Sequence, residues 1–298
     1  MLPEFLLSLL ENQYGAEIKE NIISGYSSKR AVTLRVNTLK TKPEKIKEEL
    51  TKNNIKYKEV GWSKEALIIT NTIQKEIESL QIYANGEIYL QSLSSMLPAI
   101  FLEPKGNLDI LDMAAAPGGK TTQMAALTEN KSHITACEMN AIRLERLKYN
   151  INKQGATCVY AMQKDARNLD DFFSFDKILL DSPCSGSGTL YIKDSNLYKV
   201  FTPKLIEKSI KSQKALIKKA VNLLKPGGEM VYSTCSILKE ENEQIIQTVL
   251  NSNIVEILPI SLNENYKLPL LPTKIDGTIC VCPTELYEGF YIAKLRKK

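Results

Sequence analysis

The sequence has very little histidine: His133 is the only one in 298 residues. One imidazole leaves almost no material for a Ser-His-Asp triad or a multi-histidine metal site. The Cys280 and Cys282 pair, without histidines or a second cysteine pair, does not complete a zinc site either. We therefore expect no metal, and we interpret His133, at the start of a predicted strand, as a surface residue.

The chain also lacks a long apolar run and is poor in cysteine. No run approaches the roughly 18 apolar residues of a membrane span, and the apolar stretch from Phe5 to Leu10 lacks the preceding positive charges of a signal peptide. Six cysteines in a chain of this length are typical of reduced thiols and not of a disulfide framework. These absences predict a cytoplasmic protein with no membrane partner, and we expect a monomer.

Charge is nearly balanced, with 39 Lys and Arg against 34 Asp and Glu and a formal net charge of +5. Such a balance permits a polyanionic partner without requiring one. Lysines are frequent before residue 85, where short strand patterns and one helical stretch predict a small α+β unit. We therefore predict a small basic domain over 1–85 that resembles an RNA-binding domain, and a larger domain over 86–298.

In the larger domain, short apolar runs alternate with helical patterns. This alternation is typical of an α/β fold with a parallel sheet and helices on both faces. The last apolar run, Gly289 to Leu295, follows no helix and is predicted as an antiparallel edge strand. Because ligands of such sheets bind at the carboxyl ends of strands, the residues just after each strand are the candidates for function.

A turn of small residues follows the first of these strands and opens a helix around Gly118. A phosphate-binding P-loop would need glycine where Ala114 stands, and the dinucleotide pattern G-x-G-x-x-G is absent. The turn therefore favours a ligand without a pyrophosphate, such as S-adenosylmethionine, or is merely a tight strand-to-helix connection. Glu138, at the end of the next strand, is placed to bind a ribose, and Asp165 an adenine amino group; each is otherwise a helix cap.

Two cysteines occupy equivalent positions after later strands. Asp181 and Cys184 follow one strand in a glycine-flanked loop, and Cys235 follows the next strand, before a predicted helix whose N-terminus would favour a thiolate. A buried cysteine is usually just a small apolar residue, which is how we interpret Cys137 and Cys158. Cys280 and Cys282 are interpreted as cysteines on one face of a strand.

With these motifs, the sequence resembles the Sun/Nop family (RsmB/NSUN type) of S-adenosylmethionine-dependent RNA cytosine-C5 methyltransferases. The resemblance spans nearly the whole chain and implies a Rossmann-like class I methyltransferase sheet with a small N-terminal α+β domain. It rests on seven segments: Leu34–Lys40, Gly86–Gln91, Asp112–Thr121, Asp181–Gly186, Lys225–Gly228, Tyr232–Ser236 and Glu288–Tyr291.

The resemblance also implies a role for each candidate residue. Cys235 would be the nucleophile and Cys184 the base that allows product release, while Asp181 would lie beside the methyl group and the target base. Glu138 would hold the ribose of the cofactor and Asp165 its adenine. The methionine part would be held by Ala114, Ala115, Ala116, Pro117, Gly118, Gly119 and Lys120.

The expected substrate is RNA, and ribosomal RNA is favoured over transfer RNA. A transfer-RNA cytosine methyltransferase is the alternative within the enzyme class. Outside it, the alternative is a catalytically silent RNA-binding protein, against which two cysteines at strand ends argue. One helical face carries lysines that would contact RNA or simply be solvated: Lys204, Lys208, Lys211 and Lys218.

Overall fold

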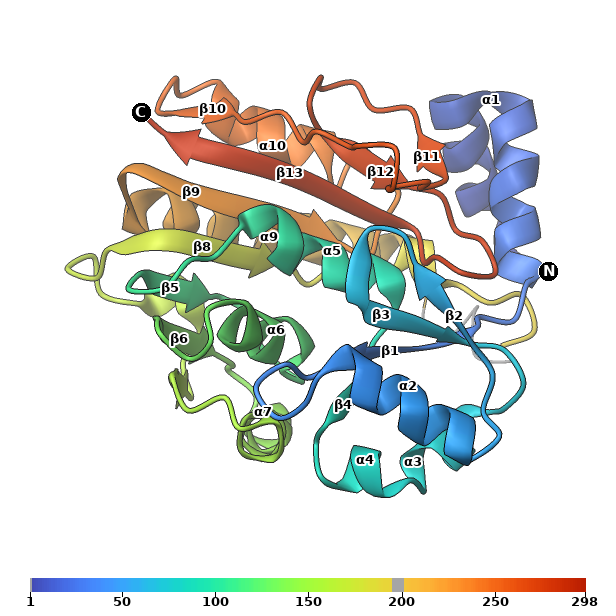
Figure 1. Ribbon diagram of the computed structural model, residues 1–298. Coiled ribbons are helices and arrows are strands. Elements are labelled where there is room, and N and C mark those ends of the chain that lie inside the picture. The colour runs from blue at the N-terminus through green and yellow to red at the C-terminus, as the bar shows by residue number, and fades with distance from the viewer. Residues whose placement is uncertain (1, 195–200) are drawn as a thin grey trace. The chain divides into compact units, whose positions relative to one another are not determined.

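The computed structural model describes residues 2–194 and 201–298 (Figure 1). Its packing divides the chain into two compact units. Each unit takes residues from both sides of position 85, so the predicted division into 1–85 and 86–298 stays a prediction. Unit 1 consists of Met1–Arg30, Asp170–Ser261 and Leu268–Lys298, and unit 2 of Ala31–Leu169 and Leu262–Lys267.

Unit 2 contains a small antiparallel sheet in the order β2-β3-β1-β4. Its strands are β1 (Val32–Val36), β2 (Tyr57–Val60), β3 (Ser63–Ile69) and β4 (Ile88–Leu90). Three helices accompany it: α2 (Pro43–Lys52), α3 (Gln74–Glu78) and α4 (Gln81–Ala84). Alternate strand residues such as Leu34 and Leu67 pack against Ile46, Ile77 and Ile82 of these helices, which forms one apolar core.

Unit 2 also contains three parallel strands, β5 (Asp109–Asp112), β6 (His133–Cys137) and β7 (Val159–Met162). The predicted alternation of strands and helices is found here. The accompanying helical segments are α5 (Leu93–Leu102), α6 (Gly119–Leu127), α7 (Ala141–Gln154) and the short 3-10 helix η1 (Ala166–Asn168).

The sheet strands of unit 1 follow the order β11-β12-β13-β9-β8, and β10 also pairs with β13. Only β8 and β9 are parallel in this set; the other pairs are antiparallel. The strands are β8 (Phe175–Asp181), β9 (Leu224–Thr234), β10 (Val255–Ile257), β11 (Leu270–Leu271), β12 (Ile279–Val281) and β13 (Phe290–Lys297). The helices are α1 (Glu4–Ser27), η2 (Ser187–Thr189), α9 (Pro203–Leu223) and α10 (Glu243–Leu250).

The prediction of an edge strand at Gly289–Leu295 is wrong, although the strand is antiparallel as predicted. Figure 1 shows β13 running between β9 and β12, and Tyr291 pairs with Thr234 on one side and Cys280 on the other. Residues 290–295 are all buried, so this strand needs partners along both edges. The segments that supply the second edge, β10 and β12, are only three residues long and gave no clear strand pattern.

Helix α1 is a structural element that the sequence reading did not identify. It is interrupted at Gly15, where φ is 80°. Leu6, Leu10, Ile22 and Tyr26 are fully buried, so the helix belongs to the core of unit 1. Among residues 2–194 and 201–298, no helix is long and apolar enough to cross a membrane.

In unit 2, the segment before β4 is fastened to the C-terminal end of α7 by two side chains. The Asn37 amide donates to the carbonyls of Gly86 and Gln154, at 2.8 and 2.7 Å. The Lys40 ammonium donates to the carbonyls of Asn85 and Lys153, at 2.8 and 2.7 Å. Gly86 has a φ of +70°, and a Cβ built there would lie 2.1 Å from the Lys153 carbonyl oxygen, so this contact requires glycine.

We predict that Gly86→Ala lowers the free energy of unfolding by about 2 to 4 kcal/mol, because it adds a steric clash to the strain of a positive φ. Gly227→Ala is the matched control: Gly227 has a φ of +75° but no atom within 4 Å of the added Cβ, so strain alone applies, at about 1 kcal/mol. Urea denaturation of the two variants measures both values. Equal losses would contradict the proposed contact.

Candidate active site

The structure brings the two candidate cysteines of unit 1 together. Cys184 follows β8 and Cys235 follows β9, and these neighbouring strands are parallel, so their carboxyl ends lie at the same edge. The hydrogen bond from the Ser182 amide to the Ser233 carbonyl, at 2.8 Å, continues the pairing just past β8. The Sγ atoms of Cys184 and Cys235 are 3.2 Å apart. One thiol is therefore within reach to donate to the other.

A buried carboxylate, Glu241, links the two cysteine loops. Its Oε1 accepts from the Ser185 amide at 2.7 Å, and its Oε2 accepts from the hydroxyls of Ser185 and Ser236, at 2.5 and 2.6 Å. Each of these serines directly follows one of the cysteines. Because Glu241 is fully buried, its contacts hold the loops in one arrangement. Glu241 is not predicted as a site residue from the sequence, because it stands in a Lys/Glu-rich stretch typical of a solvated helix.

Two tyrosines of α1 support the same loops from the other side. Tyr14 donates to the Ile237 carbonyl and Tyr26 donates to the Ser187 carbonyl, both at 2.5 Å. The Ile237 amide in turn donates to the Ser187 hydroxyl at 2.9 Å. Burial raises the pKa of each tyrosine well above its usual value, so both remain neutral donors. The N-terminal helix thus contributes directly to the geometry around the thiols.

The pKa of the Cys184 thiol is raised well above its usual value. The causes are its hydrogen bond with Cys235, its burial, and the negative charges of Cys235 and Glu241. Cys184 therefore keeps its proton at neutral pH and can donate it in a hydrogen bond to the sulfur of Cys235.

The predicted helix directly after Cys235 is wrong. Helix α10 begins at Glu243; residues 236–238 are irregular and residues 239–242 form turns. Side-chain contacts hold this segment in place of a helix: Thr234 Oγ1 donates to Asn242 Oδ1 and Tyr232 donates to the Glu241 carbonyl, both at 2.6 Å. Cys235 therefore does not lie at a helix N-terminus, and its sulfur contacts the Cys184 thiol instead.

Asp181, at the end of β8, accepts a hydrogen bond from the Ser233 hydroxyl at 2.8 Å. This contact orients the carboxylate from the strand that leads to Cys235. Asp181 is half-buried. The structure therefore places it near both cysteine loops, within the same unit.

In unit 2, the small-residue loop runs from β5 into α6. The Ala115 amide donates to the Cys137 carbonyl at 2.9 Å, which ties the loop to the end of β6. Gly118 caps α6 with a φ of 108°, and a Cβ there would lie 3.0 Å from the Leu147 side chain. The Lys120 ammonium donates to Ser95 Oγ at 2.8 Å. These contacts thus fix the loop, which has no side chain larger than a methyl group from Ala114 to Ala116.

Glu138 lies at the end of β6 and is only 4% exposed. Its Oε1 accepts from the Asn140 amide at 2.8 Å, and Arg143 lies 3.4 Å from its Oε2. The same Arg143 donates to the Ala116 carbonyl at 2.8 Å, so one guanidinium joins the carboxylate to the small-residue loop. Glu138 therefore makes a local capping contact and also lies beside the candidate ligand loop.

Asp165 caps η1, which agrees with the interpretation of this residue as a helix cap. Its carboxylate accepts from the Arg167 amide at 3.0 Å and from the Arg167 guanidinium at 2.6 to 3.0 Å. Arg167 thereby holds the pKa of Asp165 below its usual value. The adenine contact of Asp165 stays a prediction.

The remaining sequence interpretations concern residues away from these groups. Burial raises the pKa of Cys137 to about 12 and that of Cys282 to about 11, so both are neutral thiols. His133 is exposed, as predicted. The four lysines of α9 are also exposed and lie opposite its buried side, so their contact with RNA stays a prediction: Lys204, Lys208, Lys211 and Lys218.

Comparison with known proteins bears on both units. Residues 99–296 match the family described as 16S rRNA methyltransferase RsmB/F. The chain belongs to the RsmB/F methyltransferase family. Residues 2–75 match the ferredoxin-like domain of RsmF/B-like methyltransferases, which agrees with the small sheet of unit 2.

Individual relatives of this RsmB/F chain include rRNA methyltransferases from bacteria and mammals. Ribosomal RNA small subunit methyltransferase F of Shewanella sp. (strain ANA-3) is 33% identical over 93% of the chain and 58% of that protein. The 28S rRNA (cytosine-C(5))-methyltransferase of Mus musculus is 33% identical over 99% of the chain and 38% of that protein. The chain therefore spans about half the length of the curated relatives that it matches.

Among solved structures, NSun6 from Pyrococcus horikoshii with SFG has a TM-score of 0.88 to the chain and 28% sequence identity. The match covers 99% of the chain and 98% of that structure. The similarity therefore includes both the small-residue loop and the two cysteine loops of this RsmB/F member.

We predict that Glu241→Gln lowers the pKa of Cys184, because the neutral amide removes a negative charge that disfavours the Cys184 thiolate. The measurement is the pH dependence of iodoacetamide labelling at Cys184, made in a Cys235→Ala background so that one thiol of the pair reacts. Glu240→Gln, which changes the neighbouring carboxylate, should leave the labelling profile unchanged. A profile of Glu241→Gln that is unshifted or moved to higher pH would show that the charge of Glu241 does not act on Cys184.

Proposed function

We propose that this chain transfers a methyl group from S-adenosylmethionine to C5 of a cytosine in RNA, and that the RNA is ribosomal. The observation that carries the proposal is the pair of thiols at adjacent strand ends, 3.2 Å apart, in a member of the RsmB/F family. The names of its relatives support ribosomal RNA as the substrate. A cytoplasmic location, where thiols stay reduced, fits this function.

The chemistry explains why a thiol is needed. C5 of cytosine is a weak nucleophile, so a thiolate must first add to C6 and push electron density onto C5. Cys235 is the proposed nucleophile, and its sulfur forms the bond to C6. Cys184 donates a hydrogen bond to the Cys235 sulfur before attack, and Asp181, in its protonated form, donates the proton that N3 of the ring gains as the adduct forms.

A second group is needed to complete the reaction. When C5 has gained the methyl group, its proton must leave so that the electron pair can re-form the C5–C6 double bond and expel the Cys235 thiolate. Cys184 is the proposed base: its own thiol proton passes to solvent after the methyl transfer, and the resulting Cys184 thiolate takes the C5 proton. Once Cys235 is a thioether, it no longer carries the charge that raises the pKa of Cys184, so the thiolate form of Cys184 becomes easier to reach.

Residues of unit 2 fit S-adenosylmethionine, which supplies the methyl group when bound. Gly118, with a φ of 108°, begins α6 in close contact with Leu147, and the side chains of Ala114, Ala115 and Ala116 before it are no larger than a methyl group. Glu138 offers acceptors for ribose hydroxyls at the end of the adjacent strand. SFG, an S-adenosylmethionine analogue, is bound in the similar NSun6 structure, which supports the same cofactor here.

We predict that Glu138→Ala weakens binding of S-adenosylmethionine about tenfold or more, since it removes charge-assisted hydrogen bonds to the ribose. Isothermal titration calorimetry of the full chain measures the change. Glu145→Ala, which removes an exposed carboxylate of α7, is the control and should bind as the unchanged chain does. Equal affinities of the two variants would remove the ribose assignment.

We further predict opposite phenotypes for the two cysteines. Cys235→Ala should form neither adduct nor product, because it lacks the nucleophile. Cys184→Ala should still attack and methylate but should release the RNA slowly, so a covalent complex should survive denaturing gel electrophoresis, and the double variant should lose that band.

The trapped RNA of Cys184→Ala also reports the substrate. Sequencing it from cells should recover ribosomal RNA; recovery of transfer RNA would support the alternative substrate. A stable adduct with Cys235→Ala would exchange the two roles, and full activity of both variants would exclude thiol catalysis. Unchanged RNA binding without any methyl transfer by the unmodified chain would favour the silent RNA-binding protein.

A further inference from the structure

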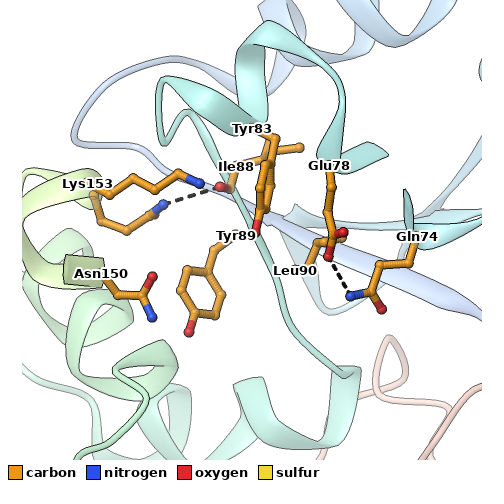
Figure 2. A pocket seen from close by; sticks show the side chains of 9 residues that line it. Gln74, Glu78, Tyr83, Ile88, Tyr89, Leu90, Asn150 and Lys153 are labelled. Atoms are coloured by element: carbon orange, nitrogen blue, oxygen red, sulfur yellow. Dashed lines mark hydrogen bonds between the residues drawn. The ribbon is translucent and has the colours of Figure 1, made fainter. Parts of the chain in front are cut away.

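A pocket of about 190 Å³ lies within unit 2, away from the small-residue loop and the thiols in sequence. Its walls come from α3, α4, β4 and the C-terminal part of α7. Figure 2 shows Tyr83, Tyr89, Lys153 and Asn150 around the hollow, with Glu78 and Gln74 at another side. Its size suits one planar ring system better than a large ligand.

The frame of this pocket is preformed. Asn37 and Lys40 fasten its two walls by the four hydrogen bonds described above, and Gly86 allows the backbones to touch. Gln154 adds a further bond from its Nε2 to the Ile88 carbonyl at 3.2 Å. A ligand that enters therefore meets walls that need no ordering, which lowers the entropic cost of binding.

An aromatic and a cationic group meet where two walls of the pocket come together. The Lys153 ammonium of α7 lies 3.6 Å from the centroid of the Tyr83 ring of α4. Tyrosine rings stack on nucleobases of any sequence, and lysine ammonium groups bind phosphates. The pocket therefore offers the two contacts that single-stranded nucleic acids use most.

A buried polar atom without a hydrogen-bond partner belongs to a residue of the pocket lining and indicates that a ligand binds there. Gln154 is only 2% exposed, and its Oε1 has no hydrogen-bond partner among the residues that the structure describes. A buried amide oxygen without a partner costs about 1 to 3 kcal/mol, so a donor that reaches it binds favourably. The Glu78 carboxylate, which accepts from Gln74 Nε2 at 2.7 Å, adds a second acceptor to the lining. An amino group or ring N–H of a nucleobase meets this requirement.

We propose that this pocket binds one unpaired nucleotide of the RNA substrate, at a position other than the target cytosine. The base stacks beside Tyr83 and donates an N–H to Gln154 Oε1, and the adjoining phosphate is bound by Lys153. The proposal rests on the proposed function only for the identity of the polymer as RNA. It assigns a binding role to a surface that carries none of the catalytic groups.

The test measures the affinity of the full chain for a fluorescently labelled single-stranded RNA by anisotropy. Tyr83→Ala should weaken binding about five- to tenfold through loss of stacking, whereas Tyr83→Phe, which keeps the ring, should bind normally. Tyr160→Ala is the matched control, because Tyr160 is an exposed tyrosine of unit 2 that does not line the pocket. Thermal unfolding of each variant separates a binding loss from a folding loss.

Two further measurements make the assignment specific. Lys153→Gln should reduce the slope of log affinity against log salt by about one, whereas Tyr83→Ala should leave that slope unchanged. An RNA series with a single abasic site at successive positions should contain one position at which the missing base weakens binding to the unmodified chain but not to Tyr83→Ala. Such a coupled loss identifies the stacked nucleotide.

Several outcomes would overturn the proposal. Equal RNA affinity of Tyr83→Ala and Tyr160→Ala would exclude stacking at this pocket. Nucleoside monophosphates that bind in a Tyr83-dependent manner without competing with RNA would assign the pocket to a free nucleotide instead. These results are independent of catalysis: a chain that transfers no methyl group but shows the coupled loss would contradict the proposed function alone, whereas normal methylation with no coupled loss would contradict the pocket alone.

Discussion

The parallel pairing of β8 with β9 is the constraint on which the thiol site depends. It directs both strands toward the same edge, so the loops that follow begin side by side. Backbone pairing ends there, and two free loops carrying reactive groups would not keep a sulfur–sulfur distance of 3.2 Å by themselves. Beyond the paired strands, the buried Glu241 carboxylate holds the two loops together, because it accepts hydrogen bonds from the residue after each cysteine.

This arrangement also determines where the proton resides. A carboxylate and a second sulfur next to Cys184 oppose its ionisation, so the proton stays on Cys184. One structural feature thus gives two chemically identical side chains different surroundings, as the proposed roles of nucleophile and base require. The cost is a buried carboxylate: desolvation raises the pKa of Glu241, and the three hydrogen bonds to it counteract only part of that effect.

Unit 2 depends on a comparable use of buried polar groups. Arg35 of β1 is only 4% exposed and donates to Gln91 Oε1, the Gly119 carbonyl and Thr122 Oγ1, at 3.0 to 3.3 Å. Burial lowers its pKa to about 10, which still leaves it charged at neutral pH. Through this side chain the small sheet fixes the start of α6, and through Asn37 it fixes the end of α7. The small sheet therefore supports both the candidate cofactor loop and the nucleotide pocket.

The sequence by itself determined the features that depend on local pattern: parallel strands alternating with helices, a compact loop before Gly118, and cysteines after two strands. Only the tertiary structure decided that β13 is an interior strand, that no helix begins at Cys235, and that α1 supports the thiol loops. The physical reason is that these outcomes depend on contacts between distant residues, such as Tyr14 with Ile237, 223 positions apart. Glu241 and Gln154 are further examples. In the sequence each is an ordinary polar residue of a helical stretch. Only packing buries these side chains and determines which donors their oxygen atoms can reach.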